Sequence, residues 1–442
     1  MKTSLSVLIT FLVISTTLAQ QKQWTLRECV DYALENNITI KQNELGVKLS
    51  EEDVINAKGN FLPNLSVSAS PGFNFGSSIG QSGSRISADN FRTSINLNSG
   101  VTLFNGFRNL NVYKQAELGV ASSKLDLEKI QDDISLFVVN AYLNILFAKE
   151  NLNVANKQYE ISEKQIDVVK SQVDAGVVAK GELLNAESTL AADAQNVIAQ
   201  ENGLDLALLT LAQLLQISTE NFDIATMEVG SPSAALLYDN STMVYDKALL
   251  NRPEIERAKN DVENANLAIE IAKGAFLPSL SLSAGAGSSY QHFFNDIFDN
   301  ASFNSQFSDN FGYSVGLSLN IPIFNRLQTK SNVNRSVINQ KIGELRLEDQ
   351  KLQLKETIER AFLDAKAAAK TFVSAQKSVI AQDEAFKNAQ ERYNYGAMTL
   401  FDFDQVRNRQ VNAESSLIRA KYDYVFKTKV LQFYYGEPIV VD

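Results

Sequence analysis

The chain has 442 residues, with 41 basic and 51 acidic side chains and a formal net charge of −10. This acidic balance argues against a nucleic-acid partner. One cysteine and one histidine exclude an internal disulfide and leave almost no material for metal clusters or for Cys/His and Ser/His/Asp catalytic sites. We therefore expect no enzyme, no metal and no cofactor.

The first 19 residues have the pattern of a secretory signal peptide. Lys2 supplies a positive charge, an apolar run extends from Leu5 to Leu18, and the small residue Ala19 ends it. The run is too short and too weakly flanked for a membrane-spanning helix, although an N-terminal anchor is the alternative. The remainder has no run of 18 or more apolar residues. We expect an exported protein without a transmembrane helix.

A repeat divides the chain into two halves. AKGNFLPNLSVSAS at 57–70 and AKGAFLPSLSLSAG at 272–285 agree at 10 of 14 positions with a shift of 215 residues. Further along the chain the shift becomes 220, which places Gly176 on Gly396. The pattern predicts a tandem internal duplication. Its repeats are assigned to 20–217 and 245–442, and the linker between them to 218–244.

Each half begins with a helix that ends at a Phe-Leu-Pro turn. Pro63 and Pro278 lack a backbone donor and push the preceding leucine out of the α region. After each proline, Ser, Gly and Asn alternate with aliphatic or aromatic residues, which is typical of a strand with one polar and one apolar face. Such runs reach the roughly 9–11 residues that a membrane strand needs. The expected strands cover about 64–76, 90–104, 279–290 and 311–324.

Four strands do not close a membrane barrel. An open sheet edge is not tolerated in lipid, so closure needs several copies of the chain. Two copies give about eight strands and three give about twelve. The alternative is a soluble sheet whose apolar faces pack together, but the polar faces carry few charges and the intervening loops are long and polar, as expected outside a membrane barrel.

A very long proline-free helical stretch follows the second strand of each half. Residues 105–175 and 325–395 correspond to roughly 105 Å of helix, which is too long to lie on a compact core. Within each stretch, small and apolar residues recur with the four-three spacing of a coiled coil, over 148–173 and 368–393. Each stretch then turns at a glycine into a return helix. The resulting helical hairpins cover 105–217, with its turn at Gly176, and 325–436, with its turn at Gly396.

In these features the sequence resembles the TolC-like outer-membrane efflux proteins over nearly the whole mature chain. The resemblance rests on WTLRECVDYALENN at 24–37, FLP at 61–63 and 276–278, VTLFNGF at 101–107, IPIFNRL at 321–327, AGVVAKGEL at 175–183 and YGAMTLFDF at 395–403. It implies a mixed α and β membrane protein: a homotrimer whose twelve-stranded β-barrel, with four strands per chain, lies in the outer-membrane lipid of a Gram-negative-type bacterium. A long periplasmic α-helical coiled-coil barrel continues it. The implied function is a passive exit duct for drugs, toxic compounds or secreted substrates.

The resemblance also implies partners. A periplasmic adaptor docks at the hairpin tips and joins the channel to an inner-membrane transporter of the resistance-nodulation-division (RND) or ABC type. Family members place an arginine at the position of Met398, so their closing contacts at the mouth are not carried over. A tight turn without a partner is the alternative for the tips. The docking positions correspond here to Gly176, Val177, Val178, Gly396, Ala397, Met398 and Thr399.

Three acidic residues are candidates for a charged ring at the periplasmic mouth. Glu182 and Asp402 lie six residues after the tip glycines, where family members place acids, and Asp404 is a weaker candidate. In a trimer each would occur three times, and a ring of carboxylates favours cations. An ordinary acid at a helix N-terminus, stabilised by the helix dipole, explains Glu182 and Asp402 equally well.

A different class of function is also compatible with these patterns. An exported coiled-coil protein of structural or adhesin type, whose Ser-rich strands form a soluble sheet, would show no pore activity. Such a protein would appear in the aqueous fraction, whereas a channel would appear in the outer membrane.

Overall fold

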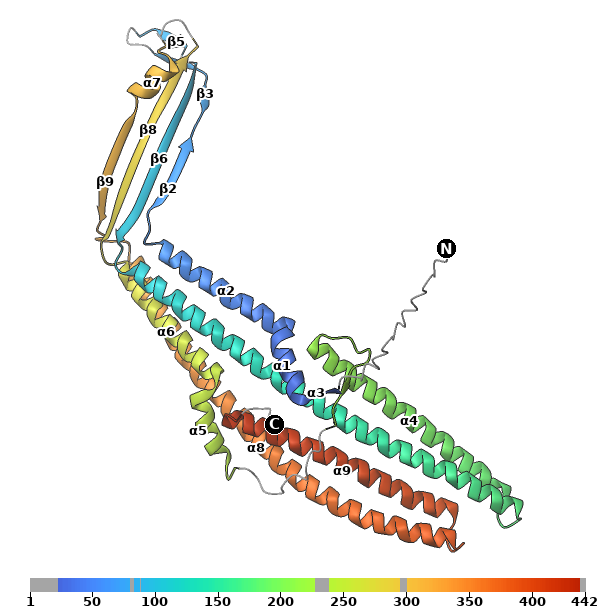
Figure 1. The fold of residues 1–442 in the computed structure, drawn as a ribbon. Helices are drawn as coiled ribbons and strands as arrows, with labels where there is room; N and C mark the ends of the chain where they lie inside the picture. The colour runs from blue at the N-terminus through green and yellow to red at the C-terminus, as the bar shows by residue number, and fades with distance from the viewer. Residues whose placement is uncertain (1–22, 80–82, 88, 227–237, 295–299, 438–442) are drawn as a thin grey trace, which may run out of the picture. The chain divides into compact units, whose positions relative to one another are not determined.

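A computed structural model describes residues 23–79, 83–87, 89–226, 238–294 and 300–437 (Figure 1). The expected signal peptide, the middle of the linker and the end of the C-terminal tail lie outside these residues. The chain forms two compact units, which we describe separately. The sheet unit comprises Gln42–Lys129 and Arg252–Gln353, and the hairpin unit comprises the described residues of Met1–Lys41, Ile130–Asn251 and Leu354–Asp442.

The sheet unit is built on one antiparallel sheet. Its strand order is β2-β6-β8-β9, and β3 also pairs with β6. The first expected strand is interrupted at Ser70 and Pro71, although the pairing register is the same on both sides. The last strand ends four residues before the expected 324, because Pro322 supplies no backbone donor. The strands are β2 Asn64–Ala69, β3 Gly72–Asn74, β6 Asn90–Phe104, β8 Ser279–Phe293 and β9 Gly312–Asn320.

The two halves of the chain pair their strands in the same way. Asn64 lies opposite Gly100 in the first half, and Ser279 lies opposite Asn320 in the second. Shifting the first pair by 215 and 220 residues gives the second pair. Between the halves, β6 pairs with β8 along nearly its whole length.

The segments between paired strands contain small elements that the alternation did not indicate. A hairpin of β4 (Ser77–Ile79) and β5 (Arg85–Ser87) lies in the first, and helix α7 (Phe303–Asp309) in the second. Because β9 does not reach the upper part of β8, side-chain amides replace the missing ladder there. Gln306 accepts from the Gln291 amide at 3.0 Å and donates to its carbonyl at 2.8 Å.

Each second strand turns into a long helix through a left-handed elbow. Gly106 and Phe107 have φ of 70° and 61°, and Arg326 and Leu327 have φ of 55° and 64°. Gly106 also approaches Gly274 so closely that an added Cβ would lie 2.2 Å from the Gly274 carbonyl oxygen. The long helices begin after the elbows, three residues later than expected. They are α3 Arg108–Asp174 and α8 Gln328–Asn394, of 67 residues each.

The single opening helix expected in each half is two helices. Backbone ψ of 129° at Asn37 and 125° at Arg252 interrupts the helix at matching positions, and Pro253 begins the next helix in the second half. Asn37 holds its break by accepting from the Thr39 amide at 2.9 Å and donating to the Leu214 carbonyl at 3.1 Å. The helices are α1 Leu26–Asn36, α2 Ile38–Gly59, α5 Ser241–Asn251 and α6 Pro253–Gly274.

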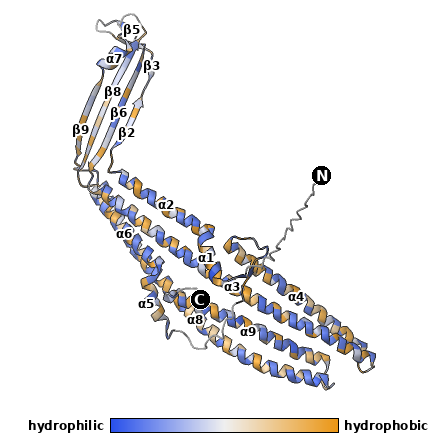
Figure 2. Ribbon diagram, viewed as in Figure 1, coloured by the Kyte–Doolittle hydropathy of each residue, from blue (hydrophilic) through white to orange (hydrophobic). Residues whose placement is uncertain are grey.

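The hairpin unit contains the far parts of α3 and α8 with their return helices. These are α4 Lys180–Leu215 and α9 Leu400–Tyr435, of 36 residues each. The short strand β1 Gln23–Trp24 pairs in parallel with β7 Asp223–Ile224. Polar and apolar residues alternate along all the helices (Figure 2). In the described residues, no helix has an apolar stretch long enough to cross a membrane.

Candidate functional site

The two hairpin tips have the same backbone turn. Gly176 and Gly396 adopt φ of 74° and 70°, which an L side chain rarely adopts. The Gly176 amide donates to the Val173 carbonyl and the Val177 amide to the Gln172 carbonyl, both at 2.9 Å. The second tip repeats this pattern, which is a Schellman motif. The glycines therefore end the long helices as the sequence predicts.

The expected docking residues differ in exposure. Val177 is 72% exposed, and Gly176, Gly396, Ala397 and Thr399 are exposed as well. Val178 and Met398 are half-buried, because their side chains pack against the hydrophobic cluster below the turns. The surface that the tips offer to a partner therefore consists of the turn backbone and Val177 and Ala397, rather than Met398.

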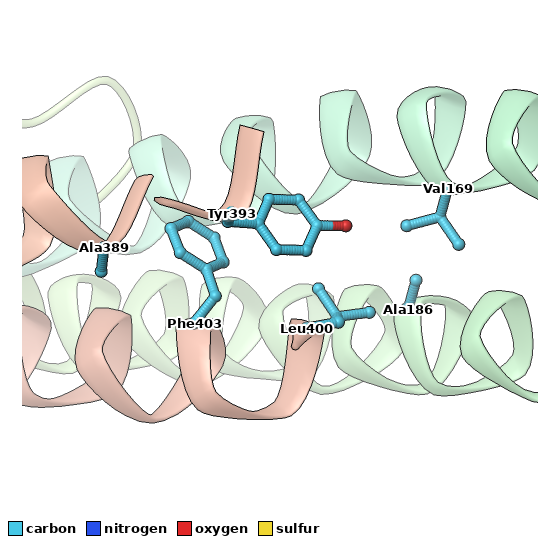
Figure 3. Close-up of a cluster of buried hydrophobic side chains, with 6 residues drawn as sticks. All are labelled: Val169, Ala186, Ala389, Tyr393, Leu400 and Phe403. Atoms are coloured by element: carbon cyan, nitrogen blue, oxygen red, sulfur yellow. The ribbon is translucent and has the colours of Figure 1, made fainter. Parts of the chain in front are cut away.

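A hydrophobic cluster joins the two tips within one chain. Figure 3 shows Tyr393 and Phe403 packed face to face, with ring centroids 5.1 Å apart and an interplanar angle of 24°. All four helices contribute, so the tips form one packed body. The buried members are Val169 of α3, Ala186 of α4, Ala389 and Tyr393 of α8, and Leu400 and Phe403 of α9.

The three acidic candidates lie in different surroundings. Glu182 is half-buried in the first turn of α4. Asp402 is exposed in the first turn of α9, where the Thr399 hydroxyl caps the helix: it accepts from the Asp402 amide at 3.2 Å and donates to its carboxylate at 2.8 Å. Asp404 is half-buried and faces Arg407. The assignment of all three to a ring stays a prediction.

A buried charged network lies next to the cluster. The Arg407 side chain of α9 is 2% exposed, and its guanidinium lies 3.3 Å from an Asp193 oxygen of α4 and 3.5 Å from an Asp404 oxygen. It also donates to the Ser162 hydroxyl of α3, which in turn donates to Asp193. The network therefore fastens α9 of the second hairpin to both helices of the first.

Burial dominates the electrostatics of Asp404. It raises the pKa of this carboxyl, and repulsion from Asp193 adds to the effect. Attraction to Arg407 and a hydrogen bond from Thr189 lower the pKa but do not cancel the rise. One arginine thus balances two carboxylates, which leaves the network with an excess of negative charge.

Sequence reasoning did not select Arg407, because arginines on a long helix are usually exposed. A signal was nevertheless present. Arg407 follows Leu400 and Phe403 with three-four spacing, which places it on the buried stripe of α9, whereas Arg409 nearby is exposed. In the described part of the chain, no group of three His, Cys, Asp or Glu side chains is placed to hold a metal ion.

The sheet has two chemically different faces. One face carries large exposed apolar side chains, among them Leu65, Val67, Val315, Leu317 and Leu319. The other carries Ser, Gly and Asn. A groove of about 540 Å³ on this polar face is lined by residues that include Arg92, Ser94, Asn96 and Asn98.

Comparison with known proteins identifies the family. The model of the family described as outer membrane efflux protein matches residues 29–215 and 244–437. The outer membrane efflux protein BepC of Brucella suis biovar 1 is 21% identical over 411 residues, which cover 92% of this chain and 84% of BepC. The CmeC outer membrane channel of Campylobacter jejuni is 21% identical with a TM-score of 0.75, covering 94% of this chain and 87% of CmeC.

VceC of Vibrio cholerae shares the fold, with a TM-score of 0.76 at 17% identity, and the match covers 94% of this chain and 97% of VceC. The family matches most of the chain, in two segments that correspond to its two halves. The resemblance inferred from the sequence is confirmed, and the chain belongs to the outer membrane efflux protein family.

Proposed function

We propose that the protein is the exit duct of a tripartite efflux or type I secretion system. As a member of its family it is an outer-membrane channel. The finer proposal is that the chain arose by tandem duplication and that three copies close a twelve-stranded barrel. Each copy contributes the four strands β2, β6, β8 and β9, and the helices continue the barrel as a periplasmic tunnel.

One observation carries this proposal: the sheet exposes an apolar face and a polar face. An exposed apolar surface of this size is a liability in water but suits the lipid-facing side of a membrane barrel. The Ser/Gly/Asn face then lines an aqueous lumen, and its few charges suit passive conduction of varied cargo. The exported adhesin-type alternative leaves the apolar face without a function.

The tips support the second part of the proposal. The exposed turns at Gly176 and Gly396 are the surfaces at which a periplasmic adaptor would dock, and the adaptor would connect the channel to an RND or ABC transporter of the inner membrane. In a trimer, Glu182 and Asp402 would each occur three times near the mouth. Rings of carboxylates would favour cations there.

Conductance in a planar lipid bilayer tests the channel. The purified protein is expected in the outer-membrane fraction and to form stable pores that conduct ions. A protein that is found in the aqueous fraction and does not conduct would establish the structural alternative instead.

A matched pair of variants on β9 provides the control. Leu317→Arg places a charge on the apolar face, where it costs about 2–4 kcal/mol near the bilayer midplane, so few assembled channels are expected. Ser318→Arg places the same charge on the polar face and is expected to assemble, with reduced cation conductance. Equal assembly of the two variants would contradict a lipid-facing apolar surface.

Crosslinking tests the docking of an adaptor. A photoreactive probe attached to a cysteine at Val177, in a Cys29→Ser background, is expected to capture an inner-membrane-anchored periplasmic adaptor. The same probe at Val168, which is also exposed but lies on α3, serves as the control. Capture from position 168 but not from 177 would overturn the docking assignment.

A further inference from the structure

The sheet of one chain has two open edges. Among the described strands, β2 pairs only with β6, and β9 pairs only with β8. Within the chain, β6 and β8 join the first half to the second with Asn98 opposite Gly285 and Gly100 opposite Ser283. The same kind of junction, between the last strand of a second half and the first strand of a first half, is missing at the edges.

The helices of the sheet unit follow the same order as the strands. Helix α2 packs on α3, where the Ser50 and Ser123 hydroxyls lie 2.7 Å apart. On its other side, α3 meets α6, where Gln115 donates to the Asn264 side chain at 2.6 Å. Helix α6 then meets α8, where Gly343 faces Val262. The order is therefore α2-α3-α6-α8, and α2 and α8 are the outer helices.

The outer helices carry exposed apolar stripes at the positions that the inner junction covers. Ile338, Ile342 and Leu345 of α8 are exposed, and Leu345 is 70% exposed. A shift of 220 places these residues on Leu118, Ser122 and Leu125 of α3, which are buried or half-buried.

Helix α2 shows the complementary stripe. Leu49, which is 70% exposed, corresponds under the 215 shift to Asn264, the residue that Gln115 contacts. Leu45 lies one turn before it and is also exposed. The junction inside the chain is therefore polar, whereas its two unpaired counterparts are apolar.

We propose that the occupant of these surfaces is a second copy of this chain. Ile338, Ile342 and Leu345 of α8 pack against Leu45 and Leu49 of α2 in the neighbouring copy, while β9 pairs with β2 of that copy. Apolar residues are needed at this junction because no peptide link holds two copies together, so buried apolar area must supply the association free energy. The inner junction is tethered by the chain and tolerates hydrogen bonds instead.

The repeat also fixes the strand register of the new junction. Gly100 lies opposite Ser283 inside the chain. Shifting these residues by 220 and 215 gives Asn320 opposite Ser68 of the neighbour, and the same operation gives Ser318 opposite Ser70. Residues 321–324 lie beyond the end of β9, but their counterparts 101–104 are strand because β8 pairs with them. We therefore expect β9 to lengthen when a neighbouring β2 is present.

Disulfide trapping tests this register, which rests on the proposed assembly of several copies. In a Cys29→Ser background, the pair Ser68→Cys and Asn320→Cys is expected to link copies into covalent trimers on mild oxidation. The control pair Ser68→Cys and Ser318→Cys lies on the same face but two residues out of register. Its Cα atoms would be roughly 8 Å apart, beyond the reach of a disulfide.

The outcomes separate this inference from the proposed function. Trimers that crosslink through the control pair, or through neither pair, would overturn the register while leaving the channel intact. Absence of any oligomer would overturn the proposed assembly itself.

The helix stripes have their own test. Leu49→Asn is expected to raise the concentration at which trimers dissociate in detergent by about tenfold or more, since it removes one buried leucine at each junction. Ile55→Asn replaces an equally exposed apolar residue on a different face of α2 and is expected to leave dissociation unchanged. Equal effects of the two variants would remove the α2 stripe from the junction.

Discussion

Arg407→Ala is expected to loosen the hairpin tips by about 3 kcal/mol of local opening free energy. The substitution removes the only cation of the network and leaves Asp193 and Asp404 close together without a partner. Breaking a buried pair typically costs about 3–5 kcal/mol. We expect the lower end, because the two carboxylates are 20% and 19% exposed and retain some contact with water. Hydrogen exchange of the α9 amides near Leu400 and Phe403 measures the effect.

Two further variants make this prediction specific. Arg409→Ala removes an exposed arginine from the same helix and is expected to leave exchange unchanged. The triple variant Arg407→Met, Asp404→Leu and Asp193→Leu replaces the whole network with apolar side chains and is expected to recover most of the protection, since apolar packing substitutes well for buried charges. Equal protection in Arg407→Ala and Arg409→Ala would show that the network does not hold the tips.

Gly106→Ala is expected to destabilise the junction between sheet and helices by about 3 kcal/mol. The new Cβ would lie 2.2 Å from the Gly274 carbonyl oxygen, and the backbone at φ 70° is unfavourable for an L residue. Strain alone is not the main cause, because Arg326 adopts φ of 55° at the matching elbow. The collision with backbone, which cannot move aside as a side chain does, accounts for most of the cost.

Hydrogen exchange of the β6 and α6 amides measures this loss. Gly46→Ala is the matched control, because Gly46 lies inside α2 and an added Cβ would meet nothing within 4 Å. That variant is expected to stabilise its helix by about 0.5–1 kcal/mol. If Gly106→Ala protected the β6 amides as well as the wild type does, the close approach to Gly274 would not matter for stability.

Local patterns predicted the main elements well. The period-two alternation gave β6 its bounds, and the proline-free stretches with four-three spacing gave the two long helices. Errors occurred where a single residue altered a regular pattern. Asn37 and Arg252 divided the opening helices, and Pro322 ended β9 early. A periodicity averages over many residues and therefore does not detect such interruptions.

The candidate site was predicted less completely than the fold. Gly176 and Gly396 were found because a left-handed helix end has a strong preference for glycine. The roles of Met398 and Asp404 depended on which neighbours surround them, and the sequence marked both only by their distance from a tip glycine. The structure instead places Met398 against the hydrophobic cluster and Asp404 beside Arg407.

The sequence by itself determined the repeated plan: helix, two strands and a helical hairpin, twice, with a glycine at each tip. This plan follows from short-range chemistry, since backbone preferences and apolar periodicity act over a few residues. Only the tertiary structure decided which residues from distant segments meet, among them Arg407 with Asp193, and Gly106 with Gly274. These contacts depend on the packing of helices that are far apart in the chain, and a linear pattern does not contain that information.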